Sequence, residues 1–148
     1  MNSPQKRFTM PVAVHLFLIR DKQVLLLRRY NTGYEDGNYS VIAGHLDGNE
    51  EISQAMIREA REEALIELQP FDLKLVGVMH RKFDSGEAVN FFFAATTWQG
   101  VIQNGEPEKC DELAWYPLDQ LPNNVVPYVR QALANYLQGT WFESYGWS

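Results

Sequence analysis

The most restrictive feature of this chain is a segment near its start, residues 8–20, that is apolar on both sides. Side chains alternate across a strand, so the two sides are separate sets: Val12, Val14, Leu16 and Leu18, and Ala13, Phe17 and Ile19. A strand of this kind must be covered on both faces. The segment contains His15 and is far shorter than the roughly 20 residues of a membrane span. It is expected to be a buried strand in a layered domain.

The remaining elements are expected between clusters of turn-forming residues. Strands are predicted at residues 24–29, 39–42, 73–79, 88–98 and 113–116, with turns or loops at 30–38, 43–50 and 80–87. Helices are predicted at 54–65, with Ser53 as N-cap, and from Pro127 to a stop at Gly139. A chain of this length suits one domain. We expect that α/β domain at residues 9–139, a leader at 1–8 and a tail at 140–148.

The charge balance restricts the partners. Thirteen Lys and Arg stand against 19 Asp and Glu, a formal net charge of −6. This disfavours a surface that follows polymeric nucleic acid or an anionic membrane. Cys110 is the only cysteine, so an intrachain disulfide is excluded, which suits a reducing compartment. Residues 1–7 lack the pattern of a secretory signal, and a cytoplasmic location is expected.

Acidic residues are concentrated on the helix predicted at 54–65. At about 100° per residue, Glu59, Glu62 and Glu63 share one stripe of that helix. Like charges one turn apart cost a few tenths of a kcal/mol, so helix stability alone does not favour them. A hard divalent cation such as Mg²⁺ would reverse that cost and could bridge the carboxylates to a phosphorylated ligand. The alternative is a solvated face whose arginines pair with their neighbours.

The surrounding residues form a longer pattern. Gly44, five residues, Glu50, seven residues and then Arg-Glu-Ala-Arg-Glu-Glu-Ala-Leu-Ile at 58–66 resembles the signature of the Nudix hydrolase family. The resemblance implies a Nudix-type α/β/α sandwich with a mixed β-sheet. Leu65 stands where the signature has Gly, and Ala43 and Asn49 where many relatives have Gly. In that place Leu65 implies either a penalty of about 1 kcal/mol or a helix that continues for part of a turn.

The resemblance also implies roles for particular residues. Glu59, Glu62 and Glu63 would bind catalytic Mg²⁺, or Mn²⁺, with a backbone carbonyl at Ala43 or Gly44 assisting. Glu59 could also act as the base. Arg58 would orient the glutamates by ion pairing, and Glu50 would close the loop onto the helix.

In several relatives the base is a carboxylate from a later loop. The candidates here are Glu106, Glu108, Asp111 and Glu112, and Glu108 is preferred from its place before the last strand. The alternative is a solvated acidic loop with no part in the chemistry.

Three residues are predicted to contact substrate. Arg28 and Arg29 end a predicted strand, and arginine forks suit phosphate oxygens. Tyr39 could stack on a base, as could Tyr34 and the aromatic residues 91–93. The alternatives are solvated strand-end arginines and core aromatics. The apolar tail makes a homodimer possible.

The leading functional hypothesis from the resemblance is a metal-dependent hydrolase. It would cleave the diphosphate linkage of a small nucleotide-type substrate, such as a nucleoside triphosphate or a nucleotide sugar. One alternative is a nucleotide-binding sensor on the same scaffold that does not hydrolyse its ligand. Another is an isomerase of allylic diphosphates, which would need a catalytic cysteine.

Overall fold

The apolar segment near the start of the chain is the central strand β1 (Val12–Arg20) of a mixed sheet. The structure, a computed structural model, describes residues 5–148. One edge of β1 pairs in parallel with β6 (Gly86–Ala95). Along its other edge, the first half of β1 pairs with β4 (Ile42–His45) and its end pairs with β2 (Gln23–Arg29), both antiparallel. The shared edge means that β2 and β4 separate as they leave β1.

The other strands extend the sheet on both sides. The order is β3-β2-β1-β6-β5-β8, with β7 paired to β2. The additional strands are β3 (Tyr39–Ser40), β5 (Lys74–Phe83), β7 (Cys110–Pro117) and β8 (Phe142–Tyr145). A short 3₁₀ turn, η1 (Pro70–Asp72), precedes β5. None of the helices within residues 5–148 combines the length and the apolar character that crossing a bilayer requires.

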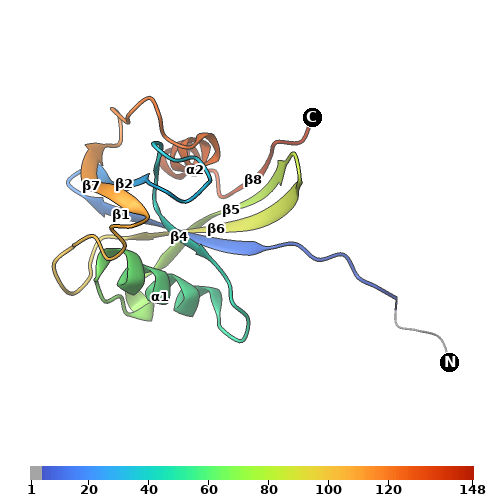
Figure 1. Cartoon of the computed structure of the whole chain (residues 1–148), viewed down its shortest axis with the longest axis horizontal. Helices are drawn as coiled ribbons and strands as arrows, with labels where there is room; N and C mark the ends of the chain where they lie inside the picture. Colours follow the sequence, from blue (N-terminus) through green and yellow to red (C-terminus); the bar gives the residue numbers. More distant parts are fainter. Residues whose placement is uncertain (1–4) are drawn as a thin grey trace.

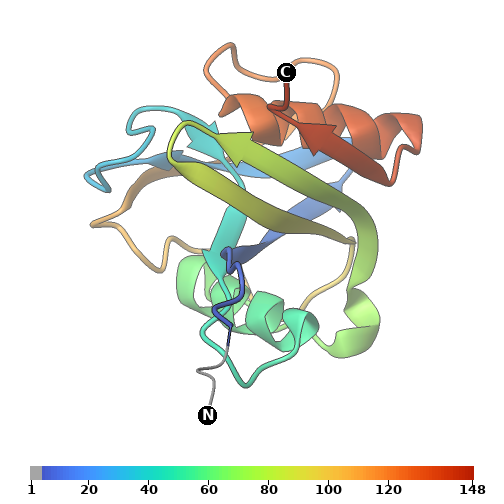
Figure 2. The ribbon, with the colours of Figure 1, turned by 90° about the vertical axis from the view of Figure 1, so that its right-hand side faces the viewer.

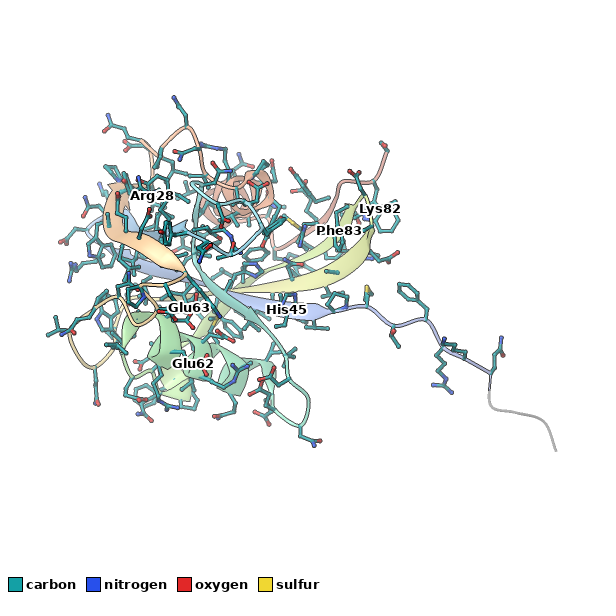
Figure 3. The ribbon with its side chains drawn as sticks, in the orientation of Figure 1. Arg28, His45, Glu62, Glu63, Lys82 and Phe83 are labelled. Carbon is teal, nitrogen blue, oxygen red and sulfur yellow. The ribbon has the colours of Figure 1, made fainter. Side chains whose placement is uncertain are left out.

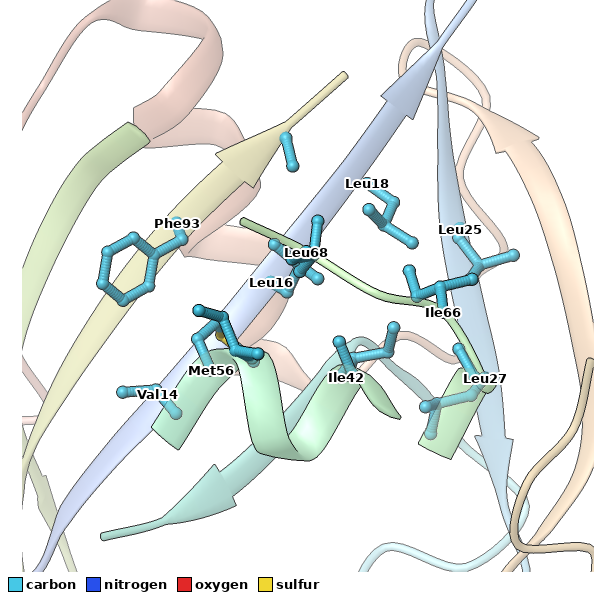
Figure 4. Close-up of a cluster of buried hydrophobic side chains, with 14 of the residues drawn as sticks. Val14, Leu16, Leu18, Leu25, Leu27, Ile42, Met56, Ile66, Leu68 and Phe93 are labelled. Carbon is cyan, nitrogen blue, oxygen red and sulfur yellow. The ribbon is translucent and has the colours of Figure 1, made fainter. Parts of the chain in front are cut away.

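Two helices cover opposite faces of the sheet, α1 (Ile52–Ala64) and α2 (Pro127–Gln138), as Figures 1 and 2 show. Each face has its own core. The core under α1, seen in Figure 4, includes Val14, Leu16, Leu18, Ile42, Met56 and Ile66. The core under α2 includes Phe17, Leu26, Met79, Phe92, Val129 and Leu133. The two-faced β1 therefore lies between them, and the expected α/β sandwich is confirmed.

Several predicted boundaries are wrong, each because pairing or packing overrides a local signal. Helix α1 begins two residues earlier than predicted, with Glu51 as its N-cap residue, so Ser53 lies inside the helix. The predicted turn at 43–50 starts later, because Gly44 pairs with Val14 in the β1–β4 ladder. The turn of the second hairpin shrinks to residues 84–85, and β7 begins at Cys110, before the predicted 113.

The C-terminal end of the chain also differs from the prediction. Residues 142–145 of the predicted tail form β8, which pairs in parallel with the edge strand β5. The tail therefore adds a strand to the sheet. The predicted leader, residues 1–8, lies partly outside the described residues.

Leu65 ends α1 in the left-handed conformation. Its φ is 56° and its ψ is 34°, and its N–H donates to the Arg61 carbonyl oxygen at 3.2 Å. The helix therefore stops where the signature glycine would stop it. We predict that Leu65→Gly raises the free energy of unfolding by about 1 kcal/mol, because glycine adopts this conformation without the Cβ clash. Chemical denaturation measures the change.

The control for Leu65→Gly is a glycine at a regular helical position. Gln54 is exposed on α1, and Gln54→Gly should lower the free energy of unfolding by up to about 1 kcal/mol. If both variants lose stability equally, Leu65 is not strained in the folded protein.

Candidate active site

Helix α1 carries its glutamates along the border between its buried face and solvent. The buried face consists of Ala55, Met56, Ile57, Ala60 and Ala64. The Ala43 N–H donates to Glu63 Oε2 at 3.2 Å, which fixes Glu63 against β4. The Glu59 side chain is 13% exposed and that of Glu62 is 49% exposed. The exposure of the three carboxylates therefore increases from Glu63, next to the sheet, through Glu59 to Glu62.

Gly44 makes room for this arrangement. A methyl group built on Gly44 would overlap the Glu59 carboxylate. Glu59 therefore lies directly over the backbone of β4, where a side chain on residue 44 would displace it. The signature glycine thus has a steric reason in this structure.

The two inner glutamates are electrostatically unfavourable by themselves. Burial is the main cause that raises the pKa of Glu63 well above its usual range, and the neighbouring charge of Glu59 adds to it. Burial likewise raises the pKa of Glu59, although hydrogen bonds from Glu63 and Arg58 oppose the shift. A proton shared between the two carboxyl groups relieves the repulsion. A divalent cation relieves the same repulsion, so the donor set is chemically suited to a hard metal ion.

The acidic side chains do not form a complete set of metal ligands in the part of the chain that the structure describes. Within residues 5–148, no three His, Cys, Asp or Glu side chains converge closely enough to constitute a set of metal ligands. Glu59 Oε1 lies 2.8 Å from the guanidinium of Arg58, a contact with which a metal ion would compete.

Arg58 connects α1 to the preceding loop. Its guanidinium lies 2.8 Å from Glu50 and 3.3 Å from Asp47, and it also donates to the His45 carbonyl oxygen. Glu50 accepts the Asp47 N–H at 3.2 Å as well. The hydrogen bond from Arg58 is the main reason that the pKa of Glu50 is lowered. These are the contacts that the sequence pattern leads one to expect for Arg58 and Glu50.

A cleft of about 570 Å³ opens beside these glutamates, in the gap between β2 and β4. The predicted site residues that line it are Arg29, Gly44, Glu59, Glu62 and Glu63. Figure 3 shows Glu62 and Glu63 on α1 and His45 on β4, with Arg28 well separated from them. The structure therefore brings most of the predicted site together around one cavity.

In the late loop, Glu106 lines the cleft, whereas the preferred candidate Glu108 is exposed outside it. The Gly105 N–H donates to the Glu63 carbonyl oxygen at 3.0 Å, which docks the loop on the end of α1. A methyl group on Gly105 would overlap the Glu62 carbonyl. Glu106 follows that close approach directly, and its charge also raises the pKa of Glu63.

Arg28 and Tyr39 lie away from the cleft. Because β2 alternates, Leu27 and Arg29 line the cleft and Arg28 does not; its Nε instead lies 2.7 Å from Asp111. Tyr39 is 7% exposed and belongs to the core under α2. Its hydroxyl donates to Glu112 Oε1 at 2.9 Å. Arg28 is therefore an arginine at a strand end, and Tyr39 is an aromatic residue of the core. Neither lies beside the glutamates.

Several residues that line the cleft were not among the predicted site residues, and they include His15, Arg81 and Tyr128. His15 is 1% exposed, and its Nε2 lies 2.9 Å from the Tyr128 hydroxyl. Burial lowers the pKa of His15 to about 3, so the imidazole is neutral. Arg81 comes from a segment predicted to be a turn, and Tyr128 from the first turn of α2. The only signal in the sequence is a polar residue, His15, within an apolar strand.

Comparison with known proteins agrees with this geometry. A model of the NUDIX domain matches residues 9–136. The NAD-capped RNA hydrolase NudC of Stutzerimonas stutzeri is 26% identical over 132 residues, which cover 82% of this chain and 41% of that protein. The protein of the same name from Escherichia coli O1:K1 / APEC is 28% identical over 113 residues, 70% of this chain and 37% of that protein. The chain spans about two fifths of the length of these curated relatives.

Solved structures give the same result for the fold. The MutT NUDIX hydrolase from Burkholderia pseudomallei has a TM-score of 0.77 at 28% identity, covering 84% of this chain and 95% of that one. A UDP-X diphosphatase has a TM-score of 0.69 at 16% identity, covering 95% of this chain and 69% of that one, a likeness of fold alone. Because the NUDIX domain model matches residues 9–136 and the signature glutamates line one cleft, the chain belongs to the Nudix hydrolase family.

Proposed function

We propose that this protein is a divalent-metal-dependent hydrolase that cleaves the diphosphate linkage between a nucleoside and a second group. The observation that carries the proposal is the cleft of about 570 Å³ in which Glu59, Glu62 and Glu63 line one wall beside Gly44. Buried like charges of this kind are costly unless a cation or a proton lies between them. The arrangement therefore favours a metal-assisted reaction over a purely structural role.

Glu59, Glu62, Glu63 and the backbone carbonyl of Gly44 would hold Mg²⁺ or Mn²⁺. When bound, such an ion neutralises charge on phosphate oxygens and lowers the pKa of water. Other residues of the chain hold these ligands in position. Arg58 pairs with Glu50 in the loop and with Glu59 on α1, which holds the loop next to the glutamates.

The proton acceptor is proposed to be Glu106, in the role that the sequence pattern suggested for Glu108. Glu106 lines the cleft and is close enough to influence the pKa of Glu63. It is held by Gly105, docked on α1, and its N–H donates to the Asn104 Oδ1 at 2.9 Å. A carboxylate in that position can accept a proton from water that attacks phosphorus.

The first substrates to consider are dinucleotide diphosphates. Two of the curated relatives are named NAD-capped RNA hydrolases, and NAD joins two nucleosides through a diphosphate. The net charge of −6 disfavours a long RNA chain as partner for this protein alone, so the small molecule is the proposed substrate. The proposed location is the cytoplasm, and dimerisation stays a possibility to be measured.

A substrate panel tests the proposed function. Nucleoside triphosphates, dinucleoside polyphosphates, nucleotide sugars and NADH are incubated with the full chain and Mg²⁺ or Mn²⁺, and products are identified by chromatography. The expected result is two phosphate-bearing products, formed only with the divalent ion. Tight calorimetric binding of a nucleotide without product formation would instead identify a sensor and overturn the proposal.

A further inference from the structure

The cleft also carries positive charge. One of its cations, Lys109, lies with its Nζ 4.0 Å from Glu106. The others are Arg29 at the end of β2 and Arg81 on β5, and together with Tyr128 on α2 we call them the basic corner. Under the proposed function, a divalent ion that bridges to the diphosphate accounts for the glutamates. The basic corner has no part in that account, and its contacts show what it is suited to bind.

Arg81 is held in place by aromatic rings and not by a carboxylate. Its Cζ lies 4.0 Å from the centre of the Tyr128 ring and 4.8 Å from that of Phe83. Its Nε is buried and, among the described residues, has no hydrogen-bond partner. The flat faces of the guanidinium are covered, while its N–H donors remain without an acceptor of opposite charge.

Arg29 is also held only by neutral groups. It donates to the Tyr34 carbonyl oxygen at 2.6 Å and to Thr32 Oγ1 at 3.1 Å. Within residues 5–148, neither Arg29 nor Arg81 has a carboxylate within 4.0 Å. By contrast, the other arginines discussed above are each ion-paired: Arg28, Arg58 and Arg61. Arg29 and Arg81 are the arginines that line the cleft, and among the residues that the structure describes both lack a carboxylate partner there.

The charges of Arg81 and Arg29 both affect Tyr128. Burial raises the pKa of Tyr128 to about 12, and the charges of Arg81 and Arg29 act in the opposite direction. Tyr128 therefore stays neutral, as does His15, to which it is hydrogen-bonded. The charge of Asp36 acts on Arg29 from a distance, but within the described residues no carboxylate lies within 4.0 Å of either arginine, so a ligand is the natural source of a directly bound anion.

Within the corner, Arg81 lies on the face of the sheet opposite to the glutamates. Asn90 pairs with Met79 on one side and with Ala13 on the other, so these three residues are on one face of the sheet. Arg81 is two residues after Met79 and is therefore on the same face, which α2 covers. The glutamates come from α1 on the other face. In Figure 3 Phe83, which touches Arg81, is separated from Glu62 and Glu63. A substrate whose diphosphate lies at α1 would reach the corner with its distal group.

We propose that the basic corner binds a phosphate monoester on the group distal to the cleaved linkage, so that the enzyme prefers diphosphate substrates carrying this additional phosphate. The inference rests on the proposed function, because the diphosphate sets the direction in which the distal group extends. Arginine forks bind phosphate oxygens bidentately, and the aromatic rings keep the fork of Arg81 in one orientation.

Matched pairs of probes that differ by one phosphate test this preference. NADPH is compared with NADH, and coenzyme A with dephospho-coenzyme A, by kcat/KM with Mg²⁺. We expect the phosphorylated member of at least one pair to be preferred about tenfold or more, the gain expected from a charge-assisted hydrogen bond. Arg81→Gln should bring that ratio near one, and Arg81→Lys should restore part of it.

Lys82→Gln is the control, because it removes one positive charge from the next residue of the same strand, which is exposed. It should keep the preference of the unmodified chain. The proposal is overturned if neither pair is discriminated, or if Arg81→Gln weakens both members of a pair equally. If neither these probes nor the substrate panel are hydrolysed, the proposed function is in error, and calorimetry with the same pairs still tests the corner. Tighter binding of the phosphorylated member that is lost in Arg81→Gln supports the corner, and equal binding overturns it.

Discussion

Replacing Glu63 by Gln lowers kcat more than about 100-fold while the fold is retained. Loss of an outer-shell partner of a metal ligand typically costs 10- to 100-fold, and Glu63 is proposed as a ligand itself. The amide keeps the shape of the side chain and removes a carboxylate that its neighbour Glu59 already disfavours. The unfolding midpoint in metal-free buffer is therefore expected to stay the same or rise. Product formation with Mg²⁺ and thermal unfolding measure the two effects.

Glu67→Gln is the matched control for Glu63→Gln. Glu67 accepts hydrogen bonds from Arg61 on the exposed side of the same segment and does not line the cleft. Its substitution removes one carboxylate and should leave kcat within about twofold, as expected for an exposed ion pair. Near-normal turnover in Glu63→Gln, or an equal loss in both variants, contradicts the proposed metal site.

Replacing Gly44 by Ala is expected to have the second largest effect. The new methyl group would overlap the Glu59 carboxylate, so that Glu59 must move while the strand pairing of β4 is kept. A displacement of about 1 Å at a catalytic group can cost about 100-fold in rate. We expect kcat to fall by about 10- to 100-fold, measured on the same substrate as for Glu63→Gln.

The control for Gly44→Ala is Gly77→Ala in β5. A methyl group at Gly77 would meet its nearest heavy atoms at 3.8 Å, an ordinary contact, and the site is remote from the glutamates. This variant should keep its kcat. If Gly44→Ala keeps it too, the close approach of Glu59 to β4 is not needed for catalysis.

The part of the site that depends on local spacing could be predicted from the sequence. Glu59, Glu62 and Glu63 lie on one helix, and helical geometry alone brings them to one stripe. Gly44 and Glu50 are close enough in the chain to be placed by the signature. The contacts of Arg58 with Glu50 and Glu59 follow from the same short separation.

The late loop could not be predicted in the same way. Glu106 and Glu108 are two residues apart, and nothing in their spacing distinguishes them. The difference arises where Gly105 meets the end of α1, a contact between segments about 40 residues apart in the chain. The choice between the two carboxylates therefore depends on docking, which a local pattern does not contain.

By itself, the sequence determined a layered domain, through a strand apolar on both faces, and the acidic stripe, through residues one helical turn apart, while the sandwich was implied by the resemblance to the Nudix family. Only the tertiary structure decided which arginine enters the cleft, because the pleat of β2 directs Arg29 inward and Arg28 toward Asp111. It also decided the opposite wall, where strand register and the packing of α2 bring Arg81 to Tyr128. Helix and strand periods act over a few residues, whereas register and packing join segments far apart in the chain.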